Sequence, residues 1–120
     1  MAKRRKTQRV QEPVAAPFRY RSARRAFDSD ADMADVLGVH RSNITRWKQG
    51  ETSPENAELL VALDVVVTLL TAFLEPESIP KWLRGFNAHL GHRQPLEVLR
   101  QGQLSEVIAA IEREKQGAFA

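Results

Sequence analysis

The stretch from 30 to 49 constrains the fold more than any other part of the chain. A small residue, a glycine and three apolar residues occur there in a fixed register: Ala34, Gly38, Val39, Ile44 and Trp47. Two short helices that cross at a steep angle need a small residue where they approach, a glycine in the turn and apolar anchors on the second helix. The register therefore predicts a helix-turn-helix motif, and a chance amphipathic pair of helices is the alternative.

Local signals set the bounds of these two helices. Ser29 is a suitable N-cap and Asp32 stands at the N3 position, so the first helix is expected to begin here. It should end at Gly38, because glycine adopts the left-handed conformation of a C-cap without strain. The second helix is expected over about Arg41–Gln49, before Gly50.

The outer face of the second helix carries the side chains that we predict to contact DNA: Arg41, Ser42, Asn43, Thr45, Arg46 and Lys48. The N-terminal part of this helix enters the major groove in such motifs. Arg41 and Arg46 are predicted to read bases, because arginine can bind guanine through two hydrogen bonds. Ser42 and Thr45 suit a base edge or a phosphate, and the others, with His40, suit phosphates. For each residue, a merely solvated polar side chain is the alternative.

Charge is distributed unevenly along the chain. Residues 1–27 hold nine of the 18 Lys and Arg residues and one of the 15 acidic residues. Such asymmetry is typical of proteins that bind nucleic acid, because cations displace counterions from phosphates. The run Lys3–Lys6 repels itself, and Pro13 and Pro17 disfavour a helix, so we predict a basic flexible arm over 1–18. A solubilising tail is the alternative.

A long apolar segment follows the motif. Ser53 and Pro54 fit the N-cap and first position of a helix that is expected to run to about Leu74. The β-branched run Val65–Val67 also suits a strand, but the length of the segment and the absence of turn residues favour a helix. Because this helix is apolar on nearly all sides, we expect the fold or a partner subunit to bury it, and we predict at least a dimer.

Shorter helices complete the prediction: one with Tyr20, Ala23 and Phe27 on one face, one around Lys81–Leu83, one over Pro95–Arg100, and one from Leu104 that Gly117 ends. A break is expected over Glu75–Pro80, and a loop around Asn87, Gly91 and Arg93. The predicted fold is all-α. We expect an arm over 1–18, the helix-turn-helix region with the long helix over 19–75, and a small helical domain over 76–120.

The chain resembles known families in two places. Residues 30–50 are similar to Xre-type (Cro/repressor-like) regulators. The segment from Trp82 to Ala120 resembles the toxin-binding domain of Xre/MbcA/ParS-type antitoxins, chiefly through the Pro95-Leu-x-x-Leu-Arg-x-Gly102 string and the ending Gly117-Ala-Phe-Ala120. In this family a proline is often found before the asparagine that matches Asn87, and the loop Arg84-Gly85-Phe86-Asn87 of this chain lacks it. The tail has Ala118 where a β-branched residue is commoner.

The resemblance implies a role as the antitoxin of a RES-type toxin, which degrades NAD, or of an ADP-ribosylating toxin of the same fold. In this family the C-terminal domain covers the toxin and the helix-turn-helix half represses the operon. The residues that the resemblance points to as toxin-facing are Trp82, Asn87, Arg93, Gly117, Ala118, Phe119 and Ala120. As alternatives, Trp82 packs in the core, Arg93 pairs with Glu97 four residues on, and Phe119 folds back on the last helix.

Composition argues against other classes of function. The chain has no cysteine, and its three histidines are accompanied by few carboxylates, so we expect no metal site and no disulfide. No nucleophile–base pair and no glycine-rich phosphate loop is apparent, so we expect neither catalysis nor a cofactor. The N-terminus has no apolar signal region and no segment suits a membrane span, so we expect a cytoplasmic protein. A stand-alone dimeric repressor and an adaptor that has lost DNA binding remain competing interpretations.

Overall fold

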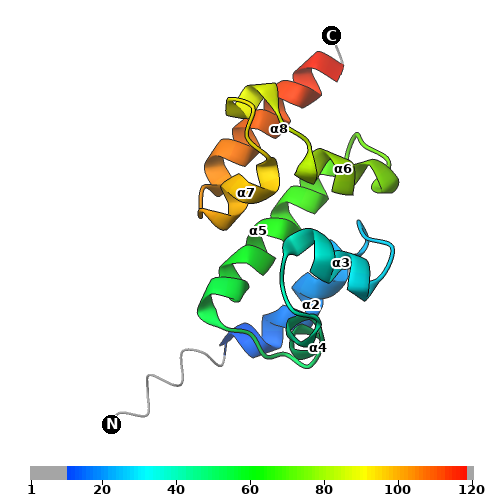
Figure 1. Cartoon of the computed structure of the whole chain (residues 1–120), viewed down its shortest axis with the longest axis vertical. Helices are drawn as coiled ribbons and strands as arrows, with labels where there is room; N and C mark the ends of the chain where they lie inside the picture. Colours follow the sequence, from blue (N-terminus) through cyan, green and yellow to red (C-terminus); the bar gives the residue numbers. More distant parts are fainter. Residues whose placement is uncertain (1–10, 119–120) are drawn as a thin grey trace.

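A computed structural model describes residues 11–118 of the chain, and the fold of this part is all-α (Figure 1). Its elements follow one another in this order: α2 (Gln11–Arg24), α3 (Asp30–Leu37), α4 (Arg41–Lys48), α5 (Pro54–Leu70), the 3₁₀ turn η1 (Pro76–Ser78), α6 (Ile79–Arg84), the 3₁₀ turn η2 (Ala88–Leu90), α7 (Pro95–Arg100) and α8 (Leu104–Ala118). None of the described helices is long and apolar enough to cross a membrane.

The predicted bounds of α3 are confirmed. The hydroxyl of Ser29 accepts a hydrogen bond from the Asp32 amide at 3.0 Å, which is the expected N-cap. Gly38 ends the helix with a φ of 71°, a left-handed conformation that favours glycine. The turn from Gly38 to His40 then leads into α4, where the imidazole Nδ1 of His40 accepts a hydrogen bond from the Ser42 amide at 3.1 Å.

Helix α5 is the centre of the fold. It begins at Pro54 with Ser53 as N-cap, as predicted, and Val65–Val67 are helical rather than extended. The helix ends at Leu70, four residues earlier than expected. The backbone tightens there, because the Thr71 hydroxyl bonds to the Thr68 carbonyl and the Phe73 amide reaches back to Leu70.

One hydrophobic core joins the N-terminal and C-terminal helices. Helix α5 packs against α2 on one side and against α7 and α8 further along (Figure 1). Its residues Leu63, Val66 and Leu70 are fully buried. The apolar residues predicted for α2, α3, α4 and the turn after α2 are buried in the same cluster, with Val39 packed against it: Tyr20, Ala23, Phe27, Ala34, Ile44 and Trp47.

The expected arm over 1–18 is wrong for residues 11–18, which belong to α2. Pro13 lies in the first turn, where its missing N–H has no partner within the helix in any case. Pro17 costs the helix one hydrogen bond, and the packing of α2 on α4 and α5 offsets that loss. Residues 1–10, with the run Lys3–Lys6, lie outside the described residues.

The C-terminal region differs from expectation at three points. The break expected over Glu75–Pro80 is occupied by η1 and by the start of α6 at Ile79, with Pro80 tolerated in the first turn. The loop around Asn87 contains η2 and a single bridge to Arg93. Gly117 does not end the last helix, since α8 continues to Ala118.

Candidate nucleic-acid and partner-binding surfaces

The outer face of α4 presents every residue that the sequence predicts for DNA contact. Four of these side chains are exposed and two are half-buried: Arg41, Thr45, Arg46 and Lys48, and Ser42 and Asn43, respectively. The opposite face is anchored by Ile44 and Trp47, which are buried. The helix therefore has one buried apolar face and one polar face open to solvent.

Local contacts orient the side chains at the start of α4. The imidazole Nδ1 of His40 lies 2.9 Å from the hydroxyl of Ser42, in addition to its bond to the Ser42 amide. The guanidinium of Arg46 lies 3.5 Å from the amide oxygen of Asn43, one turn earlier on the same face. Arg41 precedes this cluster at the first position of the helix. Two pairs of polar side chains are therefore ordered by contacts within the helix itself.

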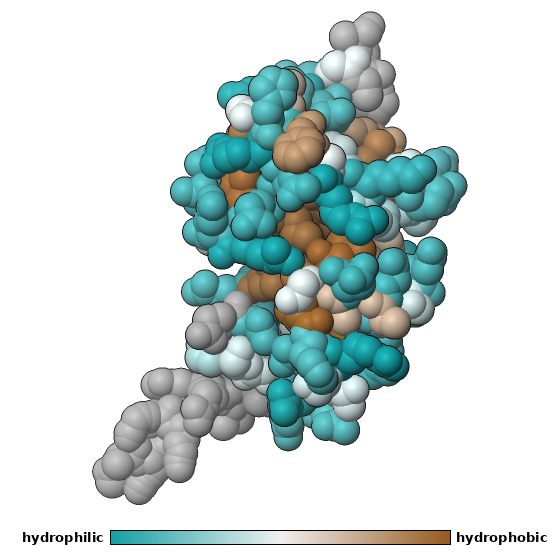
Figure 2. Space-filling view, viewed as in Figure 1, coloured by the Kyte–Doolittle hydropathy of each residue, from teal (hydrophilic) through white to brown (hydrophobic). Residues whose placement is uncertain are grey.

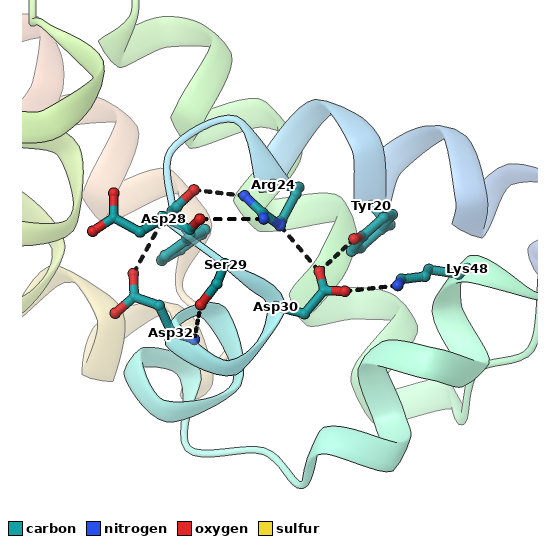
Figure 3. A network of polar contacts seen from close by, with 8 residues as sticks. Tyr20, Arg24, Asp28, Ser29, Asp30, Asp32 and Lys48 are labelled. Carbon is teal, nitrogen blue, oxygen red and sulfur yellow. Dashed lines mark hydrogen bonds and ion pairs between the residues drawn. The ribbon is translucent and has the colours of Figure 1, made fainter.

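A polar network joins α2, α3 and α4 through the carboxylate of Asp30 (Figure 3). Its Oδ1 accepts hydrogen bonds from the Tyr20 hydroxyl at 2.5 Å and from Arg24 Nε at 3.0 Å. Its Oδ2 lies 2.7 Å from the ammonium nitrogen of Lys48. Arg24 also donates to the backbone carbonyls of Phe27 and Asp28, at the turn that enters α3. The network fixes the relative positions of the three helices.

The charges of this network shift one another's protonation. Hydrogen bonds from Lys48 and then from Tyr20 lower the pKa of Asp30 from 3.8 to about 2. Burial, followed by the hydrogen bond to Asp30, raises the pKa of the Tyr20 hydroxyl. The hydrogen bond to Asp30 raises the pKa of the Lys48 ammonium. Lys48, predicted from the sequence as a phosphate contact, is thus already paired with the carboxylate of Asp30. Its side chain is nevertheless 48% exposed to solvent.

The C-terminal region forms a second candidate surface. A shallow pocket of about 350 Å³ lies between the end of α6, η2 and α8, and its lining residues are Trp82, Gly85, Phe86, Asn87, Ala88, His89 and Glu114. Trp82 is partly buried against the core and also lines the pocket, so its position is compatible with both predicted roles, core packing and partner contact. Its indole Nε1 is buried and finds no hydrogen-bond acceptor within the described part of the chain.

Asn87 and Arg93 brace the loop beside this pocket. The Asn87 side chain accepts a hydrogen bond from the His89 amide at 2.9 Å and so caps η2. Its backbone amide donates to the Arg93 carbonyl at 3.1 Å. Arg93 donates to the Leu90 carbonyl at 2.7 Å and to Glu106 of α8 at 2.6 Å. A backbone hydrogen bond therefore joins the two residues. Of the two, Asn87 lines the pocket and Arg93 does not.

The alternative pairing of Arg93 with Glu97 is wrong. Arg93 precedes the first residue of α7, Pro95, so the two residues do not share a helix in which a spacing of four would bring them together. Glu97 pairs instead with Arg100, at 3.4 Å.

The predicted tail is described only in part. Gly117 is exposed near the end of α8, and the backbone of Ala118 is helical. Phe119 and Ala120 lie outside the described residues.

The structure adds Phe86, His89 and Glu114 to the candidate partner surface. Phe86 is 76% exposed, and an exposed large aromatic at the rim of a pocket is typical of an interface anchor. Its position in the loop Gly85–Asn87, outside any apolar period, was the available sequence signal. His89 and Glu114 lie 4.0 Å apart across η2 and α8, a contact that sequence spacing does not reveal.

Apolar side chains also reach the surface around the central helix, as Figure 2 shows for one face of the molecule. Leu59, Val61, Val65 and Leu69 of α5 are only partly buried. A groove of about 710 Å³ runs between the α3–α4 turn, α5 and α7, and it includes Val39, Leu59 and Leu99. The folded chain thus leaves part of the apolar face of α5 uncovered.

The chain is similar to proteins named as antitoxins. It is 27% identical over 90 residues to the mycobacterial cidal antitoxin MbcA of Mycobacterium bovis and of Mycobacterium tuberculosis, an alignment that covers 73% of this chain and 80% of the relative. It is 29% identical over 91 residues to a probable mycobacterial cidal antitoxin of Mycobacterium tuberculosis, covering 76% and 79% of the two chains. No family model and no solved structure matches the chain. The relatives named as antitoxins thus match about three quarters of this chain.

Proposed function

We propose that this chain is a non-catalytic antitoxin that binds and neutralises a cognate toxin and represses its own operon. The observation that carries the proposal is the extent of the similarity to antitoxins, 73–76% of the chain. An alignment that covers nearly three quarters of a 120-residue chain includes the middle of the sequence wherever it begins, and α4, α5 and α6 lie there. The likeness therefore extends from one candidate surface to the other.

The proposed DNA-binding part is residues 19–75, with α3 and α4 as the helix-turn-helix of an Xre-type regulator. The polar outer face of α4 supports this, because it stands free of the core and carries two exposed arginines, Arg41 and Arg46. Arginine at the N-terminal part of a recognition helix can read guanine, and the neighbouring polar residues can bind phosphate. Ser42, Asn43, Thr45 and Lys48 are the proposed supporting contacts.

The proposed toxin-binding part is residues 76–120. The pocket beside Trp82, Asn87 and the exposed Phe86 supports it, because a partner can bury an aromatic anchor there and satisfy the unpaired indole N–H. Arg93, Gly117, Ala118, Phe119 and Ala120 complete the proposed contact set. The sequence resemblance suggests a RES-type toxin that degrades NAD, or an ADP-ribosylating one, as the cytoplasmic partner.

We further propose that the chain assembles as a homodimer or a higher oligomer. The partly uncovered apolar residues on α5 support this, since a subunit interface would remove them from water. Two copies would also present two recognition helices to the half-sites of an operator. Light scattering at micromolar concentration tests the point, and a monomer mass would contradict it.

The test of the proposed function is co-expression of the full chain with the product of the adjacent reading frame. We expect one stoichiometric complex and a partner that consumes NAD when it is released from the complex. The same chain should retard a duplex that carries the promoter of its own reading frame. DNA binding without any partner would favour the stand-alone repressor, and partner binding without DNA binding would favour the adaptor.

A further inference from the structure

A single arginine links the C-terminal helices to the end of α3. Arg100, the last residue of α7, donates a hydrogen bond from Nη2 to the backbone carbonyl of Leu37, the last residue of α3. The two residues are 63 positions apart in the sequence. Leu37 directly precedes the turn that leads into α4, so the contact reaches the most constrained part of the DNA-binding half.

The end of α3 provides a natural site for a cation. The carbonyl groups of the last helical turn carry a partial negative charge, and a basic residue there is stabilising. Helix α3 has no basic residue of its own in that turn. The amides of Gly38 and Val39 return to the carbonyls of Asp35 and Ala34, one turn back. The guanidinium of Arg100 supplies a charged donor to the carbonyl of Leu37.

Two separate features favour glycine at position 38, its backbone conformation and its closeness to Arg100. Its φ of 71° is a conformation that side chains rarely adopt. A Cβ at this position would also lie 2.5 Å from Nη2 of Arg100 and 3.3 Å from its Cζ. Gly91 offers a comparison: its φ is 66°, but among the described residues nothing lies within 4 Å of the place where its Cβ would be. Of these two glycines, Gly38 is the one at which an added methyl group would collide with the arginine.

The arginine is itself held in place. Its Nη1 lies 3.4 Å from the carboxylate of Glu97, one turn earlier in α7. Three buried residues of the same helix, Leu96, Val98 and Leu99, belong to the common core. The packing of α7 and the contact with Glu97 therefore place the guanidinium beside the end of α3.

We infer that Arg100 is a positioning residue for the recognition helix. By fixing the Leu37 carbonyl, it fixes the start of the turn Gly38–His40, and His40 is the N-cap from which α4 begins. The direction of α4, and with it the placement of Arg41, then depends on a residue of the toxin-binding half. The inference rests on the proposed function, because it assumes that α4 contacts DNA.

The test measures the affinity of full-length variants for a labelled duplex that carries the promoter of the chain's own reading frame. Arg100→Gln removes the cation, and we expect it to weaken binding about tenfold, the scale of a lost charged hydrogen bond. Arg100→Lys retains a cation and should recover part of that loss. Arg113→Gln, which removes an exposed arginine of α8, is the matched control and should bind like the wild-type chain.

A second readout separates positioning from loss of stability. All measurements are made well below the melting temperature of each variant, and the amide NMR signals of Gly38 and Val39 are compared. Arg100→Gln should shift these two signals, whereas the amide signals of the distant Phe86–Ala88 loop should stay unchanged. Unshifted signals at the turn would overturn the inference.

A double-mutant cycle tests the contact between the two residues directly. Gly38→Ala should weaken DNA binding, and combining it with Arg100→Gln should cost less than the sum of the two single losses, since both disrupt one contact. Gly91→Ala, with similar backbone strain, should leave DNA binding unchanged. A wild-type chain that binds no DNA would refute the DNA-binding function and the inference with it. Wild-type binding that Arg100→Gln leaves intact would refute the inference alone.

Discussion

The carboxylate of Asp30 and the ammonium of Lys48 lie 2.7 Å apart, and this ion pair joins the first turn of α3 to the last turn of α4. Tyr20 of α2 donates to the same carboxylate, so one acidic residue connects α2, α3 and α4 (Figure 3). Lys48 therefore has a structural role in addition to the phosphate contact predicted for it.

Acid should weaken this network over a defined range of pH. The pKa of Asp30 is about 2 in the folded chain against 3.8 for a free side chain, so the unfolded state binds the proton more readily. The stabilisation is complete above pH 3.8 and is lost as the pH falls to about 2. Thermal melting followed by circular dichroism should show Asp30→Asn less stable than the wild type at neutral pH, by about 1 kcal/mol because the side chain is partly exposed.

The two melting curves should converge as the pH approaches 2. Asp35→Asn is the matched control, since Asp35 is an exposed carboxylate of the same helix and no salt bridge is recorded for it among the described residues. A constant difference between Asp30→Asn and the wild type across this range would show that the charge of Asp30 does not stabilise the fold.

Arg46 and Lys48 should respond differently to alanine substitution. Arg46→Ala is expected to weaken binding to the promoter duplex by about 1–3 kcal/mol and to relax the sequence preference at one base pair. Lys48→Ala should weaken binding to all sequences alike and reduce its salt dependence, because phosphate contacts carry no sequence information. Arg113→Ala, an exposed arginine on α8, is the control and should bind like the wild type. Equal losses on specific and random duplexes for Arg46→Ala would exclude it as a base reader.

Phe86 should be an anchor for the toxin. Phe86→Ala is expected to lower the affinity for the partner by about 2 kcal/mol, the scale of an interface hot spot, while the melting temperature changes little because the ring is exposed. Phe18, on α2, is the matched control: it is 67% exposed against 76% for Phe86. Isothermal titration of the purified partner measures both variants. An unchanged affinity for Phe86→Ala would place the partner elsewhere on the chain.

Trp47 should contribute more to stability than Trp82. Trp47 is fully buried, so Trp47→Ala is expected to cost about 3–5 kcal/mol through the lost packing and the cavity left behind. Trp82 is only partly buried, and Trp82→Ala should cost less in urea unfolding while reducing affinity for the partner. If Trp82→Ala proved as destabilising as Trp47→Ala with no separate loss of partner binding, Trp82 would be a core residue only.

Local signals made much of the fold predictable. The caps at Ser29 and Ser53 and the glycine at position 38 mark helix ends by interactions within a few residues, so the bounds of α3 and the start of α5 followed from the sequence. The start of α2 did not follow. Its two prolines argue against a helix locally, and the favourable packing on α4 and α5 is visible only in the folded chain.

The candidate surfaces divide in the same way. Side chains of α4 share a face because of helical spacing, so the sequence could group them. The pairs Arg93–Glu106 and Arg100–Leu37 join residues that are far apart in the chain, and no periodic pattern encodes such contacts. Phe86 has only a weak sequence signal: a single aromatic outside any apolar period does not reveal by itself whether the ring is exposed or buried in the core.

The central position of α5 limits how such proteins can be recombined. The helix offers Leu63, Val66 and Leu70 to one core that α2 and the C-terminal helices share. A chimaera that takes its proposed DNA-binding part from one relative and its proposed toxin-binding part from another would have to match both parts to a single helix. Partner preference in this architecture is thus more readily altered by substitutions on the exposed loops than by exchange of whole segments.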